Sequence, residues 1–303
     1  MNLTRTRRRS NRYHVRVRFR LLFLPICALG SAAQPVPPCS NCAIWNTPQA
    51  PFKIYGNTYY VGPHGLSSIL ITSPAGDVLI DGALPESVSQ IASHIRSLGF
   101  RVEDIKLIVN SHAHFDHAGG IAELQKLSGA RVAASPWTAK VMTSGAVSKD
   151  DPQYGIIRPI ARVANVETLH DGETFTVGDI SITAHLTPGH TLGGTSWTWQ
   201  SCEGRRCMNM VYVDSMSPVS ADGYRFSRNQ GEENFERSYA FLESTPCDIL
   251  ITPHPEASDL WGRLEKRKSN PDAMMDTGAC RALAAGAREQ LKERLAKEAA
   301  GGR

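Results

Sequence analysis

The most restrictive feature of the sequence is a loop crowded with metal-binding side chains, which lies between a strand and a helix. The run IKLIV is short, apolar and β-branched, as is typical of a strand buried on both faces. SHAHFDHAGG follows it and places His112, His114, Asp116 and His117 within six positions. The next residues have helical spacing, and RVAAS reads as another strand. This order predicts a βαβ unit, with the loop at the carboxyl end of a parallel strand.

The spacing of these four side chains indicates a pair of metal ions. Side chains at i and i+2 of an extended chain point the same way, so His112 and His114 can hold one ion. The loop that follows can turn Asp116 and His117 toward a second ion, and the glycines after it permit a sharp turn. Imidazole and carboxylate ligands suit Zn²⁺. A solvated histidine-rich loop is the alternative, and the spacing at a strand-to-helix junction argues against it.

Two distant histidines stand where further ligands are expected. His190 follows the strand DISITAHL in the motif TPGHT, and His254 follows the strand DILI in TPHPE. In α/β proteins the ends of strands gather the loops that form active sites. Of the other histidines beyond residue 33, we interpret three as structural: His94, His170 and His185. His64, in GPHGLSS, could reach the rim of a pocket.

The basic charge of the chain is confined to its beginning. Residues 1–20 hold eight arginines and no acid, and LLFLPICALG and SAAQ follow. A basic region, about ten apolar residues and a small-x-small site describe a secretory leader over 1–33, cleaved after Ala33. Ten apolar residues are too few to span a bilayer, which needs about 20. Without these eight arginines the net charge of +4 becomes −4, so we expect a soluble periplasmic protein that binds no nucleic acid and has no stable membrane association.

Cysteine usage agrees with export. Removing Cys27 with the leader leaves six cysteines, and an even number in an exported chain suggests disulfides. Cys202 and Cys207 flank EGRR and predict a stapled turn, worth roughly 2 kcal/mol. Cys247 and Cys280 would close a longer loop, worth roughly 4 kcal/mol.

The CSNC motif has two interpretations. Cys39 and Cys42 lie in a proline-rich stretch just after the leader, which favours a structural pair, whereas C-x-x-C at a helix start is also a redox motif. The sequence alone allows 15 pairings of six cysteines, so the pairing of these two stays open.

The rest of the chain reads as one α/β domain. After an N-terminal tail over 34–51, residues 52–303 alternate short β-rich segments with helical ones, in two similar halves and with no low-complexity block between them. Helical spacing is clear over 86–100 and in the closing segment CRALAAGAREQLKERLAKEAA. We expect two sheets that face each other, with helices outside.

His-x-His-x-Asp-His, then Thr-Pro-Gly-His, a strand that ends in aspartate and a late histidine together resemble the metallo-β-lactamase superfamily. From about Phe52 to the last helix the chain is similar to the class B, subclass 3 β-lactamases, through GNTYYVG, SHAHFDHAGG, TPGHTLGGTSWTW, VYVDSMS and CDILITPHPEAS. The resemblance implies a four-layer αβ/βα sandwich, with two internal mixed sheets, helices outside and the site at one edge of the sheets.

The resemblance also implies two zinc ions. The first would be held by His112, His114 and His190, and the second by Asp116, His117 and His254. Ser215 stands where other subclasses place a cysteine ligand, and Ser215 and Ser217 are expected to orient a substrate carboxylate. Related thioesterases and lactonases use an aspartate near Asp214 to bridge both metals. We expect Asp214 not to ligate, because the second site already has three residues.

The implied activity is zinc-dependent hydrolysis of the β-lactam amide bond of penicillins, cephalosporins and carbapenems, which gives antibiotic resistance. A zinc-bound hydroxide would attack the carbonyl carbon, with Asp116 as the catalytic residue that holds the second zinc and orients the nucleophile. We expect a monomer. One alternative is a zinc hydrolase of the same fold acting on a lactone, thioester or phosphodiester, and another is a non-catalytic periplasmic zinc-binding protein. The loop SKDDPQYGIIRP either covers the pocket, through Gln153 or Tyr154, or is a plain surface loop.

Overall fold

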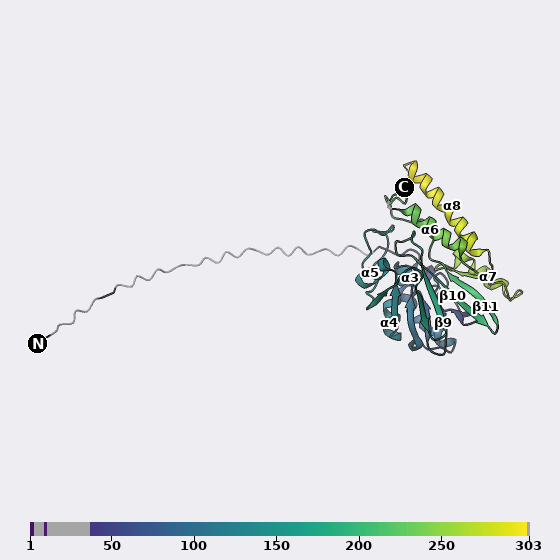
Figure 1. The fold of residues 1–303 in the computed structure, drawn as a ribbon, viewed down its shortest axis with the longest axis horizontal. Coiled ribbons are helices and arrows are strands. Elements are labelled where there is room, and N and C mark those ends of the chain that lie inside the picture. The colour runs from purple at the N-terminus through teal and green to yellow at the C-terminus, as the bar shows by residue number, and fades with distance from the viewer. Residues whose placement is uncertain (3–8, 11–36, 229, 302–303) are drawn as a thin grey trace. The chain divides into compact units, whose positions relative to one another are not determined.

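A computed structural model describes residues 1–2, 9–10, 37–228 and 230–301 (Figure 1). The secretory leader predicted for 1–33 therefore lies almost wholly outside the described residues. The residues from 37 onward belong to one compact unit. The predicted tail over 34–51 is thus part of the domain where it is described, and it contains the short helix α1 (Cys42–Trp45). Within the described part of the chain, no helix combines the length and apolar composition needed to cross a membrane.

Two mixed sheets form the centre of the domain. The first has seven strands in the order β1 to β7, antiparallel from β1 to β4 and parallel from β4 to β7. Its strands are β1 (Phe52–Tyr55), β2 (Thr58–Tyr60), β3 (Ile69–Ile71), β4 (Asp77–Ile80), β5 (Ile105–Val109), β6 (Arg131–Ala134) and β7 (Val166–Thr168). The second has five strands in the order β12-β11-β10-β9-β8. Its strands are β8 (Thr174–Val177), β9 (Ile180–Leu186), β10 (Thr195–Glu203), β11 (Arg206–Tyr212) and β12 (Ile249–Ile251).

Helices cover the outer face of each sheet. The first sheet is covered by α2 (Val88–Ser97), α4 (Ile121–Ser128) and α5 (Pro136–Ser144). The second is covered by α6 (Gly231–Ser244) and α8 (Ala279–Ala299), which lie side by side in Figure 1. The remaining helical segments are short: α3 (Phe115–Ala118), α7 (Leu260–Lys266) and the 3₁₀ turns η1 (Pro85–Ser87), η2 (Val102–Asp104) and η3 (Pro255–Ser258).

The alternation of side chains along the strands explains the layers. In β4, Leu79 packs under the helices of the first sheet, while Val78 and Ile80 face the second sheet. In β11, Met210 faces the first sheet, while Val211 packs under α6 and α8. Strands that are apolar on both faces can be buried only between two other layers. The result is a four-layer αβ/βα sandwich, and the predicted fold class is confirmed.

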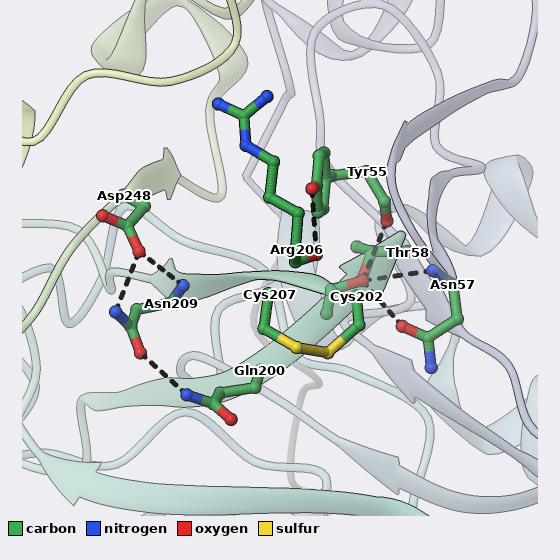
Figure 2. The surroundings of a disulfide bond; sticks show 10 residues. Tyr55, Asn57, Thr58, Gln200, Cys202, Arg206, Cys207, Asn209 and Asp248 are labelled. Carbon is green, nitrogen blue, oxygen red and sulfur yellow. Dashed lines mark hydrogen bonds between the residues drawn. A yellow bond between two sulfur atoms is a disulfide. The ribbon is translucent and has the colours of Figure 1, made fainter. Parts of the chain in front are cut away.

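Both predicted cysteine pairs form disulfides, and so do the two cysteines whose pairing the sequence left open. Cys202 and Cys207 pair across the β10–β11 hairpin at directly opposite positions (Figure 2). Cys247 and Cys280 join the start of β12 to the start of α8, and Cys39 is bonded to Cys42 beside α1. The open question about CSNC is thus answered in favour of a paired state.

The hairpin disulfide lies beside a set of hydrogen bonds that connect residues 55–57 of the first sheet with residues 201 and 206 of the second. The Oγ of Ser201 donates to the carbonyl oxygen of Tyr55 at 2.9 Å. The hydroxyl of Tyr55 donates to the carbonyl oxygen of Arg206 at 3.0 Å (Figure 2). The same Oγ accepts from the backbone N–H of Asn57 at 3.1 Å. These contacts fix the edges of the two sheets relative to each other.

Candidate metal centre

The strands bring the predicted ligands to one edge of the second sheet. β10 is antiparallel to both β9 and β11, and β12 is parallel to β11, so β9, β11 and β12 end at the same edge. His190 follows β9, Asp214 and Ser215 follow β11, and His254 follows β12. The loop after β5 meets this edge through the backbone N–H of Thr195, which donates to the carbonyl oxygen of Ser111 at 2.8 Å.

Six predicted ligands form two groups, and the candidate ligand atoms within each group lie within 4.8 Å of one another. We call the first group His112, His114 and His190, and the second group Asp116, His117 and His254. These are the two sets that the sequence analysis assigned. Five of the six are buried, and His254 is partly exposed.

The ligand loop owes its shape to close packing rather than to an unusual backbone. His114 is extended and precedes α3, whose first turn carries Asp116 and His117. Gly119 and Gly120, expected to permit a sharp turn, both have ordinary helical φ values. A Cβ on Gly120 would lie 2.3 Å from the carbonyl oxygen of Gly82. That expectation was therefore wrong in its reason: glycine is needed because another backbone passes too closely for a side chain.

Each ring of the first group has one nitrogen engaged by the protein. Nδ1 of His112 lies 2.7 Å from Oδ1 of Asp214, and Nδ1 of His190 lies 2.9 Å from the carbonyl oxygen of Ser217. Nε2 of His114 lies 3.1 Å from Oδ2 of Asp151. Such contacts orient the rings of metal-binding histidines and decide which ring nitrogen can bind the metal.

One buried atom tests whether a metal fits the first group. Nε2 of His112 has no hydrogen-bond partner among the described residues, although the side chain is completely buried. A buried polar atom without a partner costs about 1–3 kcal/mol, so an orphan at the centre of a histidine cluster indicates a missing ligand. Imidazoles with a carboxylate suit a divalent transition metal. The residues present therefore fit a dinuclear metal site.

The electrostatics of the cluster keep His112, His190 and Asp116 in their metal-binding forms. Burial and the neighbouring His114 lower the pKa of His190 to about 3, and burial with the same neighbour lowers the pKa of His112 well below its ordinary value. Burial alone would raise the pKa of Asp116, but His117 and His254 hold it well below its ordinary value. Neutral imidazole and ionised carboxylate are the states that bind metal.

Asp81 forms the base of the site. Its carboxylate accepts from the N–H and Oγ of Ser111 at 2.7 and 2.8 Å, and from the hydroxyl of Tyr212 at 2.6 Å. Tyr212 belongs to the second sheet and Ser111 to the ligand loop of the first, so one buried carboxylate joins the two sheets directly behind the ligands. Asp81 itself has φ +62°, a left-handed conformation held by these bonds.

A cavity of about 580 Å³ adjoins the second group. Ser215 and Ser217 line it, and among the six ligands it is lined by His254 alone. The rest of its wall comes mainly from residues 250–259 and from α8, so the cavity reaches the metal groups only at one end. Asp214 is not a member of either group, and its expected lack of a bond to metal stays a prediction. Its Oδ1 contacts a ring nitrogen of the first group instead.

Three contacts near the site were missed or left open by the sequence. Asp151 was not singled out at all, although it contacts His114. Gln153, named as one of two possible pocket residues, has its Nε2 3.3 Å from Nε2 of His190. The ring of Trp45, from the predicted tail, lies 5.3 Å from the ring of His254. The only signal for Trp45 was an aromatic residue in a short segment that also contains prolines and cysteines.

The other histidines have structural partners. His64 stacks on Trp261 with ring centroids 4.5 Å apart. It does not line the cavity beside His254. Nδ1 of His94 contacts the carbonyl oxygen of Val61 at 2.9 Å, and Nε2 of His185 contacts Thr198 at 2.8 Å. Neither metal group includes any of these three.

Comparison with known proteins identifies the family. The family model of the metallo-beta-lactamase superfamily matches residues 61–203. The chain is 54% identical to Rm3 metallo-beta-lactamase, with a TM-score of 0.85, over 86% of this chain and 99% of that one. The chain belongs to the metallo-β-lactamase superfamily. Within the superfamily it is also 50% identical to MEM-A1, a subclass B3 metallo-beta-lactamase from a soil metagenome library, with a TM-score of 0.83 over 85% of this chain and 99% of that one. The predicted family and subclass resemblance are confirmed, and these matches support a hydrolase of the metallo-β-lactamase type.

A second set of superfamily relatives matches only in part. The chain is 36% identical over 89 residues to a hydroxyacylglutathione hydrolase of Maricaulis maris, which is 29% of this chain and 27% of that enzyme. It is 30% identical over 131 residues to the enzyme of the same name from Rhodopseudomonas palustris, of which it covers 42%. The chain thus spans less than half the length of these relatives.

Proposed function

We propose that this protein is a zinc-dependent β-lactamase that hydrolyses the amide bond of penicillins, cephalosporins and carbapenems. The observation that carries the proposal is the pair of ligand groups, three residues each. Ser217 lies next to the first group, because its carbonyl oxygen is 2.9 Å from Nδ1 of His190. Two solved structures that share half or more of the sequence bear the name metallo-beta-lactamase. Bound zinc would acidify water to a pKa of about 7 and polarise a carbonyl group.

The residues of the chain have distinct tasks in this proposal. His112, His114 and His190 would hold the first zinc, and Asp116, His117 and His254 the second. Oδ2 of Asp116 lies 3.3 Å from Nε2 of His117 and 3.4 Å from Nε2 of His254, and these neighbours keep the pKa of Asp116 low. Its ionised carboxylate could hold a metal and accept a hydrogen bond from the attacking water. Ser215 and Ser217 would donate hydrogen bonds to the carboxylate that β-lactams carry, which places the ring over the metals.

The partial matches name a second candidate, a zinc hydrolase of a glutathione thioester. An aspartate that bridges both metals distinguishes such hydrolases in the family resemblance. Asp214 is the aspartate near that position; its Oδ1 lies 2.7 Å from Nδ1 of His112, and it is a member of neither group. This placement favours the lactam over the thioester as substrate.

We further propose that the mature protein is an exported, periplasmic monomer. The arginine-rich first 20 residues and the apolar run after them support export, and three disulfides suit an oxidising compartment. Cleavage after Ala33 would leave the disulfides and both ligand groups in the mature chain.

A hydrolysis panel tests the proposal. The zinc-loaded mature protein should open penicillin, cephalosporin and carbapenem rings, followed by the loss of ring absorbance, faster than it cleaves a lactoylglutathione thioester. Asp116→Asn should collapse turnover. Asp179→Asn, in the exposed turn between β8 and β9, should not change it. A wild-type protein that cleaves the thioester and leaves all three lactams intact would reverse the assignment.

A further inference from the structure

The loop that joins α5 to β7 contacts two ligands of the first group. Both carboxylate oxygens of Asp151 lie near Nε2 of His114, at 3.2 and 3.1 Å, and both side chains are at least 95% buried. Two positions later, Nε2 of Gln153 lies 3.3 Å from Nε2 of His190. A carboxylate in a polar surface loop is ordinarily solvated, so its burial against a histidine needs an explanation.

The same carboxylate also fixes its own loop. Oδ1 of Asp151 accepts from the backbone N–H of Gln153 at 2.7 Å. The carbonyl oxygen of Pro152 accepts from the N–H of Ala221 at 2.8 Å. Ala221 lies in the segment that begins with Ser217, whose carbonyl oxygen engages the ring of another ligand. The two loops that flank the first group are therefore joined to each other as well as to its histidines.

The chemistry of these acceptors determines which nitrogen each ring can offer. A neutral imidazole carries one proton, and the hydrogen bond of one ring nitrogen decides which lone pair is free. An ionised carboxylate only accepts, so the contact with Asp151 requires the proton of His114 on Nε2 and leaves Nδ1 for a metal. The carbonyl oxygen of Ser217 requires the proton of His190 on Nδ1 and leaves Nε2.

We propose that Asp151 is a positioning residue, which sets the ring orientation and tautomer of His114 and couples the loop that carries Gln153 to the first zinc. The inference rests on the proposed metal site but not on the substrate. Loss of an outer contact of this kind typically weakens metal binding or activity by roughly 10- to 100-fold. The carboxylate of Asp151 contacts both a ligand, His114, and the backbone of its own loop. A metal bound at the first group would therefore also restrain this loop at the edge of the site.

The chain offers a closely matched set of variants. Asp151→Ala removes the acceptor, and Asp151→Asn keeps a neutral acceptor of the same size. Asp150→Ala is the control, because Asp150 is exposed on the same loop and, among the described residues, its side chain bonds to Trp137 and Ser148 and to neither metal group. Zinc affinity is measured by competition with a chromophoric chelator. The tautomers are read from the ring-nitrogen NMR shifts of the metal-free protein.

The expected result is a graded loss. Asp151→Ala should weaken the first zinc roughly 10- to 100-fold, Asp151→Asn should weaken it less, and Asp150→Ala should match the wild type. Metal-free wild type should carry the His114 proton on Nε2, which tests the proposal even if a variant does not fold. A proton on Nδ1 in the wild type, or equal zinc affinity in Asp151→Ala and wild type, would overturn the proposal. Neither readout depends on β-lactam hydrolysis, so a failure here is distinct from a failure of the proposed activity.

Discussion

Replacing Gly120 by alanine tests how the ligand loop is held against the first sheet. The added Cβ would lie 2.3 Å from the carbonyl oxygen of Gly82 and 2.9 Å from Cγ2 of Val88. The φ of Gly120 is −84°, which any residue can adopt, so the clash is the whole cost in the folded state. The nearest atom belongs to the backbone and cannot rotate away, so the helix α4 or the end of β4 must shift.

The size of the effect follows from two opposing contributions. Overpacking of a close contact costs about 1–3 kcal/mol, and a backbone neighbour places this case in the upper half. Loss of glycine's freedom in the unfolded chain returns about 0.4–1 kcal/mol. We expect Gly120→Ala to lower the free energy of unfolding by about 1–2 kcal/mol. Gly286→Ala should raise it by about 0.5–1 kcal/mol, because Gly286 lies within α8 with nothing within 4 Å of its Cβ position.

The assay is equilibrium urea unfolding of the metal-free protein with its disulfides intact. Metal must be removed because a ligand that binds only the folded state adds to the measured stability. The two variants carry the same chemical change and should move the midpoint in opposite directions, with an unchanged dependence on urea. If Gly120→Ala is as stable as the wild type, or if both variants move together, the close-approach explanation is refuted.

Three further predictions concern stability and the second group. Burial raises the pKa of Asp77 to about 6, so the unfolded chain releases this proton more easily than the folded protein does. The free energy of unfolding therefore falls as pH rises from about 4 to 6. Asp77→Asn should therefore stabilise the protein by on the order of 1–2 kcal/mol at pH 7.5 and by nothing at pH 4, as measured by urea unfolding; an equal gain at both pH values would contradict the assignment. Removing Cys247 and Cys280 together by alanine substitution opens a loop with a sequence separation of 33 and should cost about 4 kcal/mol on the chain-entropy model; an unchanged thermal midpoint would refute this. Trp45→Ala should weaken zinc at the second group about 10-fold, measured by chelator competition, whereas the exposed neighbour Ile44→Ala should not; equal effects would remove the role of the indole ring.

The parts of the site that were predictable are those coded by local spacing. The four side chains from His112 to His117 follow a strand and precede a helix, so their convergence is a property of about ten residues. His190 and His254 were predictable because each stands shortly after the end of a strand, and strands that run in the same direction end at one edge. The fold followed from the same strands, since apolar residues on both faces require layers above and below.

The parts that were missed depend on contacts between distant segments. Asp151 lies 37 residues after His114, in a stretch whose polar composition describes a surface loop equally well. Trp45 contacts His254 from the other end of the chain, and no periodicity records such a contact. The elements that were overlooked are of the same kind: β7 has three residues, and α5 and β8 have weakly apolar patterns that become interpretable only against their neighbours.

The most direct test of the account is the zinc content of the mature protein after equilibrium dialysis, for the wild type, His190→Ala and Asp116→Asn. The account predicts two zinc ions per wild-type chain and one in each variant, because each substitution removes a ligand from a different group. A wild-type chain that binds a single zinc ion, or variants that both retain two, would contradict it.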